Sequence, residues 1–156
     1  MKPMPLTLLE RQRWLAPFAC LLALLALPAQ AQLSERYGPY ELHYSVVNTS
    51  FLAPEIAARY QLTRGRNYAI LNLAVREHLD DGSTEARAMR LQGSATDLLN
   101  KQQVLDFQEI REGSAIYYIA EFRFIDEEWL RFEVDFRPEG GTRSYRFELR
   151  KQLYEN

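Results

Sequence analysis

Two arginines on either side of a glycine are the residues whose types and spacing best suit binding chemistry. The segment TRGRN at 63–67 places Arg64 and Arg66 directly before a run of apolar residues. A guanidinium group offers a planar fork of donors that matches a carboxylate or another small anion. Asn67 adds an amide that can donate or accept a hydrogen bond. We therefore take Arg64, Arg66 and Asn67 as the candidate site for an anion or an acidic partner. The alternative is an ordinary loop whose arginines pair with nearby carboxylates.

The residues that usually carry catalysis are scarce. The chain has two histidines, His43 and His78, and one cysteine, Cys20. It lacks the motifs of a hydrolase elbow, a phosphate-binding loop and a helical zinc site. Because Glu41, His43 and Ser45 alternate with apolar residues, the three would share one face of a strand. His43 or a carboxylate as base is therefore the alternative, enzymatic interpretation. No cofactor and no metal site is indicated.

Acidic residues gather in two short segments, Asp80 with Asp81 and the run at 126–128. Such clusters could hold calcium or supply an acid and a base. Neither has the spacing of a calcium-binding loop. We interpret both as solvated turns that keep sheet edges from pairing with other chains.

The first 31 residues have the pattern of a secretory signal peptide. Basic residues precede an apolar run at 15–27, and the Ala-x-Ala pattern at 29–31 marks a cleavage site. The apolar run is shorter than the roughly 20 residues that a membrane-spanning helix needs. We predict cleavage between Ala31 and Gln32, export to the periplasm and no stable membrane span afterwards.

The remaining residues, 32–156, suffice for a single domain with its own core. Cys20 lies in the predicted signal peptide, so the stability of this domain must come from packing and not from disulfides. The whole chain carries 19 basic and 21 acidic side chains, for a net charge of −2. Both signs are interleaved along the chain, which argues against a nucleic-acid partner.

Alternation of apolar and polar residues is the main structural signal in residues 32–156. It predicts strands at 40–47, 68–75, 85–98, 104–110, 116–124, 130–136 and 145–149, with the pattern weakest at 85–98. Proline at the start of 54–60 predicts one short helix. The fold class is therefore all-β, an antiparallel immunoglobulin-like β-sandwich of about seven strands. A closed barrel is the alternative.

The strands at 116–124 and 130–136 are separated only by the acidic turn. We expect them to follow one another at the centre of a sheet. A hairpin then joins 130–136 to 145–149, and charge pairing favours one of its two registers. In that register the opposite pairs are Glu133–Arg146, Phe132–Phe147 and Arg131–Glu148. A shift by two residues would place like charges opposite each other.

Several segments together resemble an uncharacterised family of small secreted proteins of Gram-negative bacteria, a domain of unknown function. These segments are YELHYS at 40–45, NTSFL at 48–52, TRGRN at 63–67, LNLAV at 71–75 and AIYYIA at 115–120. The resemblance implies a periplasmic location and a compact β-rich domain. It brings no activity, cofactor or site residue.

We therefore expect a periplasmic binding or adaptor module that recognises another envelope protein or a small anionic ligand. The alternative is a hydrolase-type or other enzyme with a pocket at one end of the sandwich. A flat surface with exposed Tyr117 and Ile119 would favour the adaptor. A pocket that encloses His43 beside an acidic residue would favour the enzyme.

Overall fold

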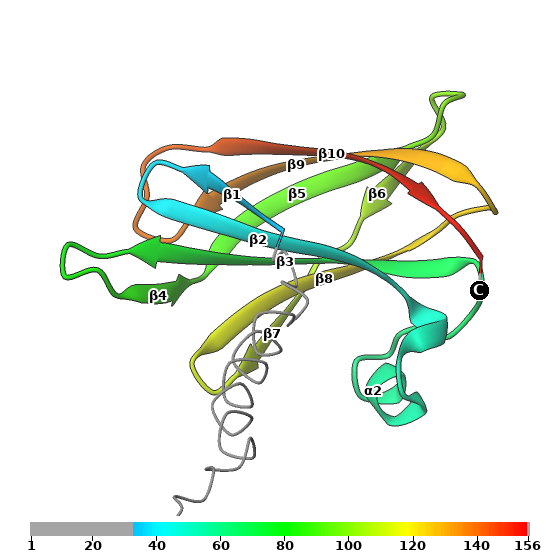
Figure 1. Cartoon of the computed structure of the whole chain (residues 1–156), viewed down its shortest axis with the longest axis horizontal. Helices are drawn as coiled ribbons and strands as arrows, with labels where there is room; N and C mark the ends of the chain where they lie inside the picture. Colours follow the sequence, from blue (N-terminus) through cyan, green and yellow to red (C-terminus); the bar gives the residue numbers. More distant parts are fainter. Residues whose placement is uncertain (1–32, 156) are drawn as a thin grey trace, which may run out of the picture. The chain divides into compact units, whose positions relative to one another are not determined.

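The computed structural model describes residues 33–155, which form two antiparallel β-sheets packed face to face (Figure 1). The first sheet contains β1 (Ser34–Tyr37), β2 (Tyr40–Asn48), β3 (Tyr68–His78), β4 (Thr84–Arg87), β7 (Gln108–Glu112) and β8 (Ala115–Arg123). The second contains β5 (Met89–Thr96), β6 (Gln102–Leu105), β9 (Glu128–Pro138) and β10 (Tyr145–Leu153). The predicted all-β sandwich is confirmed, with ten strands in the described range where about seven were expected. The immunoglobulin-like strand arrangement stays a prediction.

The predicted signal peptide and the bond between Ala31 and Gln32 lie outside the described residues. Within 33–155, no helix has both the length and the apolar character needed to pass through a membrane.

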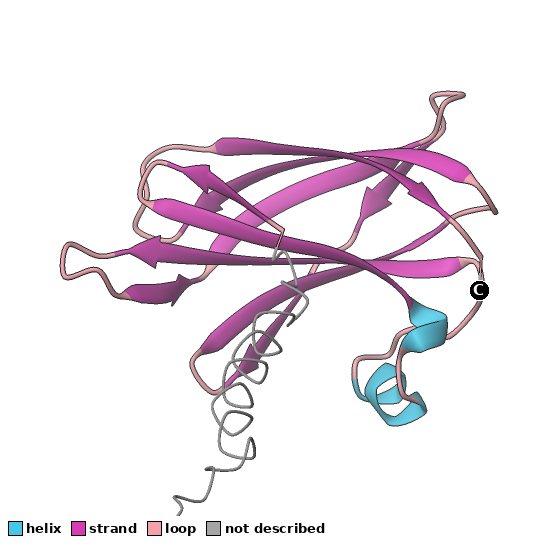
Figure 2. Ribbon diagram, in the orientation of Figure 1, coloured by secondary structure: helices cyan, strands magenta, loops and turns pink. Residues whose placement is uncertain are grey.

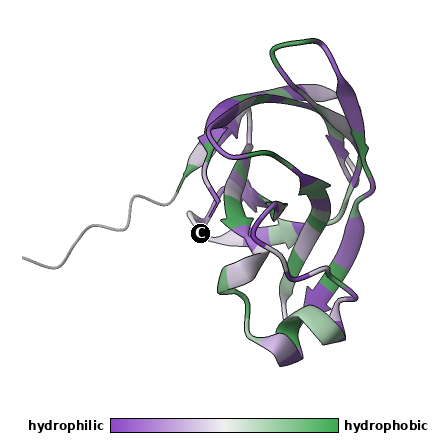
Figure 3. Ribbon diagram, turned by 90° about the vertical axis from the view of Figure 1, so that its right-hand side faces the viewer, coloured by the Kyte–Doolittle hydropathy of each residue, from purple (hydrophilic) through white to green (hydrophobic). Residues whose placement is uncertain are grey.

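Each sheet buries the side chains that the alternating pattern assigns to one face. In β9, Leu130, Phe132, Val134 and Phe136 are buried, whereas Arg131 between them is exposed. Colouring by hydropathy shows the same change between polar and apolar residues along the strands (Figure 3). Burying a large apolar side chain contributes about 1.5–3 kcal/mol, so the pattern determines which face of each strand turns inward.

Most strand pairs join strands that follow one another in the sequence, but each sheet also contains one pair that does not. The first sheet has the order β1-β2-β3-β8-β7, with β4 also paired to β3, and the second has the order β10-β9-β5-β6. Strand β3 therefore pairs with β8, and β5 pairs with β9 (Figure 1). Each sheet is assembled from segments that lie far apart in the sequence.

The expected succession of the strands at 116–124 and 130–136 in one sheet is wrong. Strand β8 lies between β3 and β7 in the first sheet, and β9 lies between β10 and β5 in the second. The acidic segment between them carries the chain from one sheet to the other. Each strand is central in its own sheet, as expected, but alternation alone does not reveal which strand is the neighbour.

The single strand expected at 104–110 is also divided between the sheets. Strand β6 ends at Leu105 and β7 begins at Gln108, and the two belong to different sheets. Leu105 is buried and Phe107 is partly buried against the core. The chain crosses between the sheets here while it keeps both apolar side chains on the core.

The register of the β9–β10 hairpin differs from the predicted one. Phe147 lies opposite Val134, so the strands are shifted by two residues relative to the expectation. Like charges consequently face each other on the outer surface. These pairs are Glu133 with Glu148 and Arg131 with Arg150. The prediction of opposite charges at these positions was wrong.

Two contacts near the turn explain the observed register. Arg146 lies opposite Asp135 and makes two hydrogen bonds to its carboxylate, at 2.9 and 3.1 Å. Tyr145 lies opposite Phe136, with ring centroids 5.6 Å apart. An aromatic pair adds about 0.5–1.5 kcal/mol beyond its buried area, whereas a like-charged cross-strand pair costs about 0.2–1 kcal/mol. Packing at the turn therefore outweighs charge pairing along the strand.

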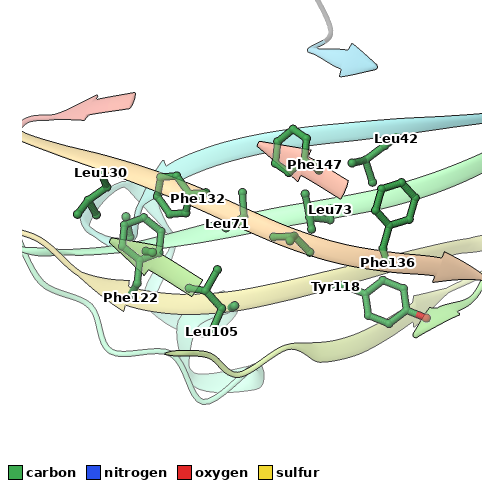
Figure 4. Close-up of a cluster of buried hydrophobic side chains, with 14 of the residues drawn as sticks. Leu42, Leu71, Leu73, Leu105, Tyr118, Phe122, Leu130, Phe132, Phe136 and Phe147 are labelled. Atoms are coloured by element: carbon green, nitrogen blue, oxygen red, sulfur yellow. The ribbon is translucent and has the colours of Figure 1, made fainter. Parts of the chain in front are cut away.

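The inner faces of the two sheets form one apolar core (Figure 4). Phe122 of β8 meets Phe132 of β9 edge to face, with ring centroids 5.0 Å apart. Tyr44 of β2 packs on Phe147 of β10 at 4.7 Å. These contacts between aromatic rings join the two sheets.

Tyr118 of β8 also joins the sheets through hydrogen bonds. Its hydroxyl accepts a hydrogen bond from Met89 N of β5 at 2.9 Å and donates one to Glu109 of β7 at 2.6 Å. Burial and the hydrogen bond to the Glu109 carboxylate raise the pKa of Tyr118 to about 12. The hydroxyl therefore stays protonated near neutral pH and can serve both partners.

The connection from β2 to β3 contains the described helices, the 3-10 turn η1 (Thr49–Phe51) and α2 (Pro54–Arg59) (Figure 2). The predicted short helix at 54–60 is confirmed. Helix α2 lies at the same end of the domain as the C-terminus (Figure 1).

Candidate functional site

The outer face of the first sheet carries a pocket over β2, β3 and β8. His43 lies opposite Ala74, and Ser45 lies opposite Asn72, so these four residues share the face that points away from the core. The pocket has a volume of about 280 Å³. It is lined by Leu33, His43, Tyr44, Ser45, Asn72, Ala74, Val75, Arg76, Ala86, Ala115, Ile116 and Tyr117. Most of these side chains are apolar, and a few polar groups lie among them, as is typical of small-molecule sites.

Two polar atoms of the pocket are buried without a hydrogen bond. Within the described part of the chain, His43 Nδ1 and Asn72 Oδ1 have no partner. The two residues are diagonal neighbours on adjacent strands, a separation of about 7–8 Å. Buried polar atoms are nearly always hydrogen-bonded, and an unpaired one costs about 1–3 kcal/mol. A ligand that bonded both atoms would remove this cost.

The carboxylate nearest to His43 along the strand is already engaged. Glu41 accepts a hydrogen bond of 2.7 Å from Ser34 Oγ, and His78 Nε2 lies 2.7 Å from its other oxygen. The pKa of Glu41 is below its usual range. The hydrogen bond from Ser34 is the largest cause, and the one with His78 comes second. Glu41 is therefore ionised near neutral pH and is a weak base.

The geometry does not join Glu41, His43 and Ser45 into a catalytic relay. The three residues share a strand face, as the sequence predicts, yet no hydrogen bond links His43 to either neighbour among the described residues. A relay needs the nucleophile and the base within hydrogen-bond reach, about 2.6–3.2 Å. The arrangement is better suited to holding a ligand than to moving a proton.

Arg76 supplies a positive charge at the pocket wall. Its Nε donates to Thr84 Oγ1 at 2.8 Å, and its Nη2 donates to the Thr84 carbonyl oxygen at 2.7 Å. These bonds to β4 fix the position of the guanidinium group. Sequence reasoning did not single out Asn72 or Arg76. The available signal was the polar Asn72 within the apolar run of β3.

Tyr117 and Ile119 do not form the exposed patch that would favour an adaptor. Ile119 is only 7% exposed, and Tyr117 is half-buried in the pocket wall. The structure instead has a pocket that His43 lines, which is part of the arrangement expected to favour the enzyme. The acidic partner is missing from it, because Glu41 is not among the lining residues and bonds to Ser34 and His78.

The loop with Arg64, Arg66 and Asn67 lies elsewhere, between α2 and β3 (Figure 1). Arg64 Nη2 donates to the Ser50 carbonyl oxygen at 3.1 Å. The Arg66 side chain is 73% exposed, and its Nε lies 4.0 Å from a carboxylate oxygen of Glu155. The carbonyl of Asn67 accepts a hydrogen bond from Phe124 N at 3.1 Å. The two arginines thus have their contacts with different segments, and a role for this loop stays a prediction.

Thr49 holds the backbone of that loop. The Thr49 side chain is fully buried, and its Oγ1 accepts a hydrogen bond from Gly65 N at 3.1 Å. The same oxygen lies 3.1 Å from the Tyr68 carbonyl, to which it can donate. The loop is therefore anchored to the start of β3.

The acidic clusters serve the turns that contain them. Asp81 accepts hydrogen bonds from the backbone and side chain of Ser83, which lower the pKa of Asp81. Glu128 accepts a hydrogen bond from Ile125 N, and Asp126 accepts one from Glu155 N. Across residues 33–155, no group of three or more His, Cys, Asp or Glu side chains could hold a metal ion.

Comparison with known proteins shows a family and a fold. The family model described as DUF4426, a domain of unknown function, matches residues 34–156. A crystal structure of a DUF4426 family protein from Pseudomonas aeruginosa has a TM-score of 0.69 at 29% identity, covering 82% of this chain and 98% of that chain. A search of curated proteins finds no match.

Two structures of FetP from uropathogenic Escherichia coli are also similar. FetP as isolated after recombinant expression in the periplasm of E. coli has a TM-score of 0.58 at 10% identity, covering 80% of this chain and 94% of that chain. A copper-bound FetP variant has a TM-score of 0.58 at 9% identity, covering 81% and 97%. At this identity, the similarity to FetP shows a shared fold alone.

Proposed function

The chain belongs to DUF4426, a family defined by a domain of unknown function, and we propose that it is a binding module that takes a small ligand in the pocket over β2, β3 and β8. The family resemblance expected from the sequence is thereby confirmed. One observation carries the proposal: His43 Nδ1 and Asn72 Oδ1 are buried in the same pocket without hydrogen-bond partners.

The lining indicates the chemistry of the ligand. Asn72 Oδ1 accepts hydrogen bonds only, so the ligand must present an N–H or O–H donor to it. His43 Nδ1 can donate or accept, depending on the tautomer. The apolar side chains around these atoms favour a compact organic body, and Arg76 favours a polar or negatively charged end. An amino acid or a hydroxy acid has this combination of groups.

The proposed place of action is the periplasm. In support of it, the first 31 residues have the pattern of a signal peptide, with cleavage between Ala31 and Gln32. Residues 32–156 would then act as one exported domain. FetP contributes only its shared fold, and copper is not part of this proposal, since no suitable group of ligands is found among the described residues.

A thermal-shift screen tests the binding proposal. The full chain is mixed with a panel of amino acids, hydroxy acids and sugars, and the melting temperature Tm is recorded for the wild type and for Asn72→Leu. A ligand that binds only the folded state raises Tm according to its concentration over its Kd. We expect at least one solute to raise the Tm of the wild type and to leave the Tm of the variant unchanged.

The same variant tests the cost of the unpaired atom without any ligand. Replacing Asn72 by leucine removes a buried acceptor, so the free protein should gain about 1 kcal/mol of unfolding free energy. Gln92→Leu is the matched control, because Gln92 lies exposed on the outer face of the second sheet. If Asn72→Leu destabilised the free protein as much as a core cavity does, Asn72 would be a structural residue and the proposal would fall.

Catalysis with His43 as base is the second candidate function. In its favour, His43 is a titratable group inside the pocket, with Glu41 two residues away on the same face. Activity that rises with deprotonation of a histidine and is lost in His43→Gln would support it. Binding that persists in His43→Gln with no turnover of the bound ligand would support the binding module.

A further inference from the structure

We propose that Arg131, Arg150 and Trp129 form a second binding site, on the outer face of the second sheet, for a small monocarboxylate with a planar apolar body. The site is independent of the pocket over β2, β3 and β8.

The observed register puts two arginines on neighbouring strands side by side, and both line the same pocket. Arg131 of β9 lies directly opposite Arg150 of β10, and both side chains are exposed. The register with a two-residue shift would have paired Arg131 with Glu148. Like charges directly opposite each other destabilise a sheet, so the contacts near the turn bring this pair together at a cost. A bound anion would remove that cost.

The two arginines differ in how their charges are balanced. Arg131 Nε lies 3.3 Å from Glu133 Oε2, which neutralises part of its charge. Arg150 takes part in none of the ion pairs formed within residues 33–155. One guanidinium group is therefore held beside a carboxylate, and the other is free to take an anion from solution.

A pocket of about 200 Å³ adjoins the arginine pair. Trp129 forms part of its wall and is 41% exposed, and Leu98 is 67% exposed. The lining residues are Thr96, Asp97, Leu98, Asn100, Trp129, Leu130, Arg131 and Arg150. An indole and a leucine that remain accessible beside two guanidinium groups combine an apolar platform with an anion clamp.

The turn between β5 and β6 forms another wall of this pocket. Its own hydrogen bonds order it. Asp97 Oδ1 accepts hydrogen bonds from Leu99 N and Lys101 N, both at 2.8 Å. Asn100 adopts a left-handed backbone with φ of 62°, a conformation that asparagine tolerates well. The turn that carries Leu98 thus holds its shape before a ligand arrives, which lowers the entropy lost on binding.

The charges in and beside the pocket set the ligand class. A carboxylate can accept paired hydrogen bonds from a guanidinium fork, and a planar group can stack on an indole. Asp97 in the lining and Glu133 beside Arg131 are both negative, so a second anionic group on the ligand would be repelled. An aryl monocarboxylate satisfies all three conditions.

Trp129 provides the measurement. The chain has two tryptophans, and in a Trp14→Phe full-length protein Trp129 is the only one left. Phenylacetate is titrated while tryptophan fluorescence is followed, and phenylacetamide serves as the neutral probe of the same shape. We expect a saturable change with phenylacetate and at least tenfold weaker binding of phenylacetamide.

Variants locate the site. Arg150→Gln should weaken phenylacetate binding at least tenfold, whereas Arg137→Gln should leave it unchanged. Arg137 is the matched control, because it also faces a like charge, Arg90, on the same outer face. Thermal melting of both variants confirms that they fold. Asn72→Leu should not alter phenylacetate binding, which separates this site from the pocket of the proposed function.

Three results would overturn the proposal. The first is a fluorescence change that does not saturate. The second is equal binding of phenylacetate and phenylacetamide, which would leave an apolar surface without an anion site. The third is an unchanged affinity in folded Arg150→Gln.

Discussion

The outer faces of the two sheets differ in how they treat polar groups. On the first sheet, His43 and Asn72 carry uncharged polar atoms that are buried without partners, within a mostly apolar pocket. On the second sheet, exposed charged side chains form rows across the strands, including Arg131 opposite Arg150 and Arg90 opposite Arg137. The outer face of the first sheet buries a few polar atoms, whereas that of the second sheet exposes many charged side chains to water.

The two proposed sites would therefore recognise ligands in two physical ways. A desolvated polar atom makes a specific hydrogen bond, and its partner is selected by shape and donor chemistry. An exposed charge attracts over a longer distance, and salt weakens its effect. Substitutions that exchange these properties should have unequal effects on the two faces.

The largest expected effect comes from placing a charge on the desolvated face. Asn72→Lys should lower the unfolding free energy by about 3 kcal/mol, because an unpaired buried charge is costly. The same change on the other face, Gln92→Lys, should alter it by no more than about 0.5 kcal/mol, because Gln92 is exposed and lies opposite Asp135. Urea denaturation of both variants gives the comparison. Equal losses would show that the two faces are solvated alike.

A smaller effect concerns the carboxylates that each face holds. The pKa of Glu41 is lowered by hydrogen bonds from Ser34 and His78, and that of Asp135 by Arg146. A carboxyl group whose pKa is lowered in the folded state stabilises the protein at any pH above the pKa that the group has in the unfolded chain, about 4. This contribution is lost as the pH falls through the lowered pKa.

Glu41→Gln should therefore reduce stability at pH 7 by about 1–2 kcal/mol, and the difference from wild type should shrink as the pH falls below about 4. Asp135→Asn should cost less than about 1 kcal/mol, because the Arg146 pair is exposed. Denaturation at pH 7 in 0.1 and 1 M NaCl separates the two. Salt should suppress the Asp135 contribution and largely spare that of Glu41. The contrast fails if both contributions are screened equally.

The smallest expected effect is a gain in stability on the charged face. Arg90→Glu would replace a like-charged pair with Arg137 by an opposite-charged one. We expect a stabilisation of about 0.5 kcal/mol in low salt that disappears in 1 M NaCl. Tm measured at the two salt concentrations shows whether the rows of like charge cost stability. A loss of Tm at low salt would contradict the assumption that they do.

The sequence predicted the strands well because alternation records which side chains are buried. The predicted pairing of strands was wrong for β8 and β9. Alternation indicates which face of a strand is buried, but it does not indicate which strand lies beside it. It misjudged the register because charge pairing was weighed without the Tyr145–Phe136 contact near the turn.

For the candidate site, the sequence singled out His43 but missed Asn72, which lies on another strand. Arg131 and Arg150 become neighbours only through the observed register. Sites that depend on pairing between strands cannot be found from alternation alone.

The pairing of β3 with β8 and of β5 with β9 has a consequence for how the chain reaches its native state. Neither sheet can gain its central ladder until most of the domain has been synthesised, because β8 and β9 come late in the chain. Proteins dominated by such distant contacts fold in milliseconds to seconds, more slowly than helical bundles. The early strands β1 to β4 can pair with one another, but the edge of β3 that β8 covers stays open until then. We expect this edge to need protection from aggregation until the last third of the chain arrives.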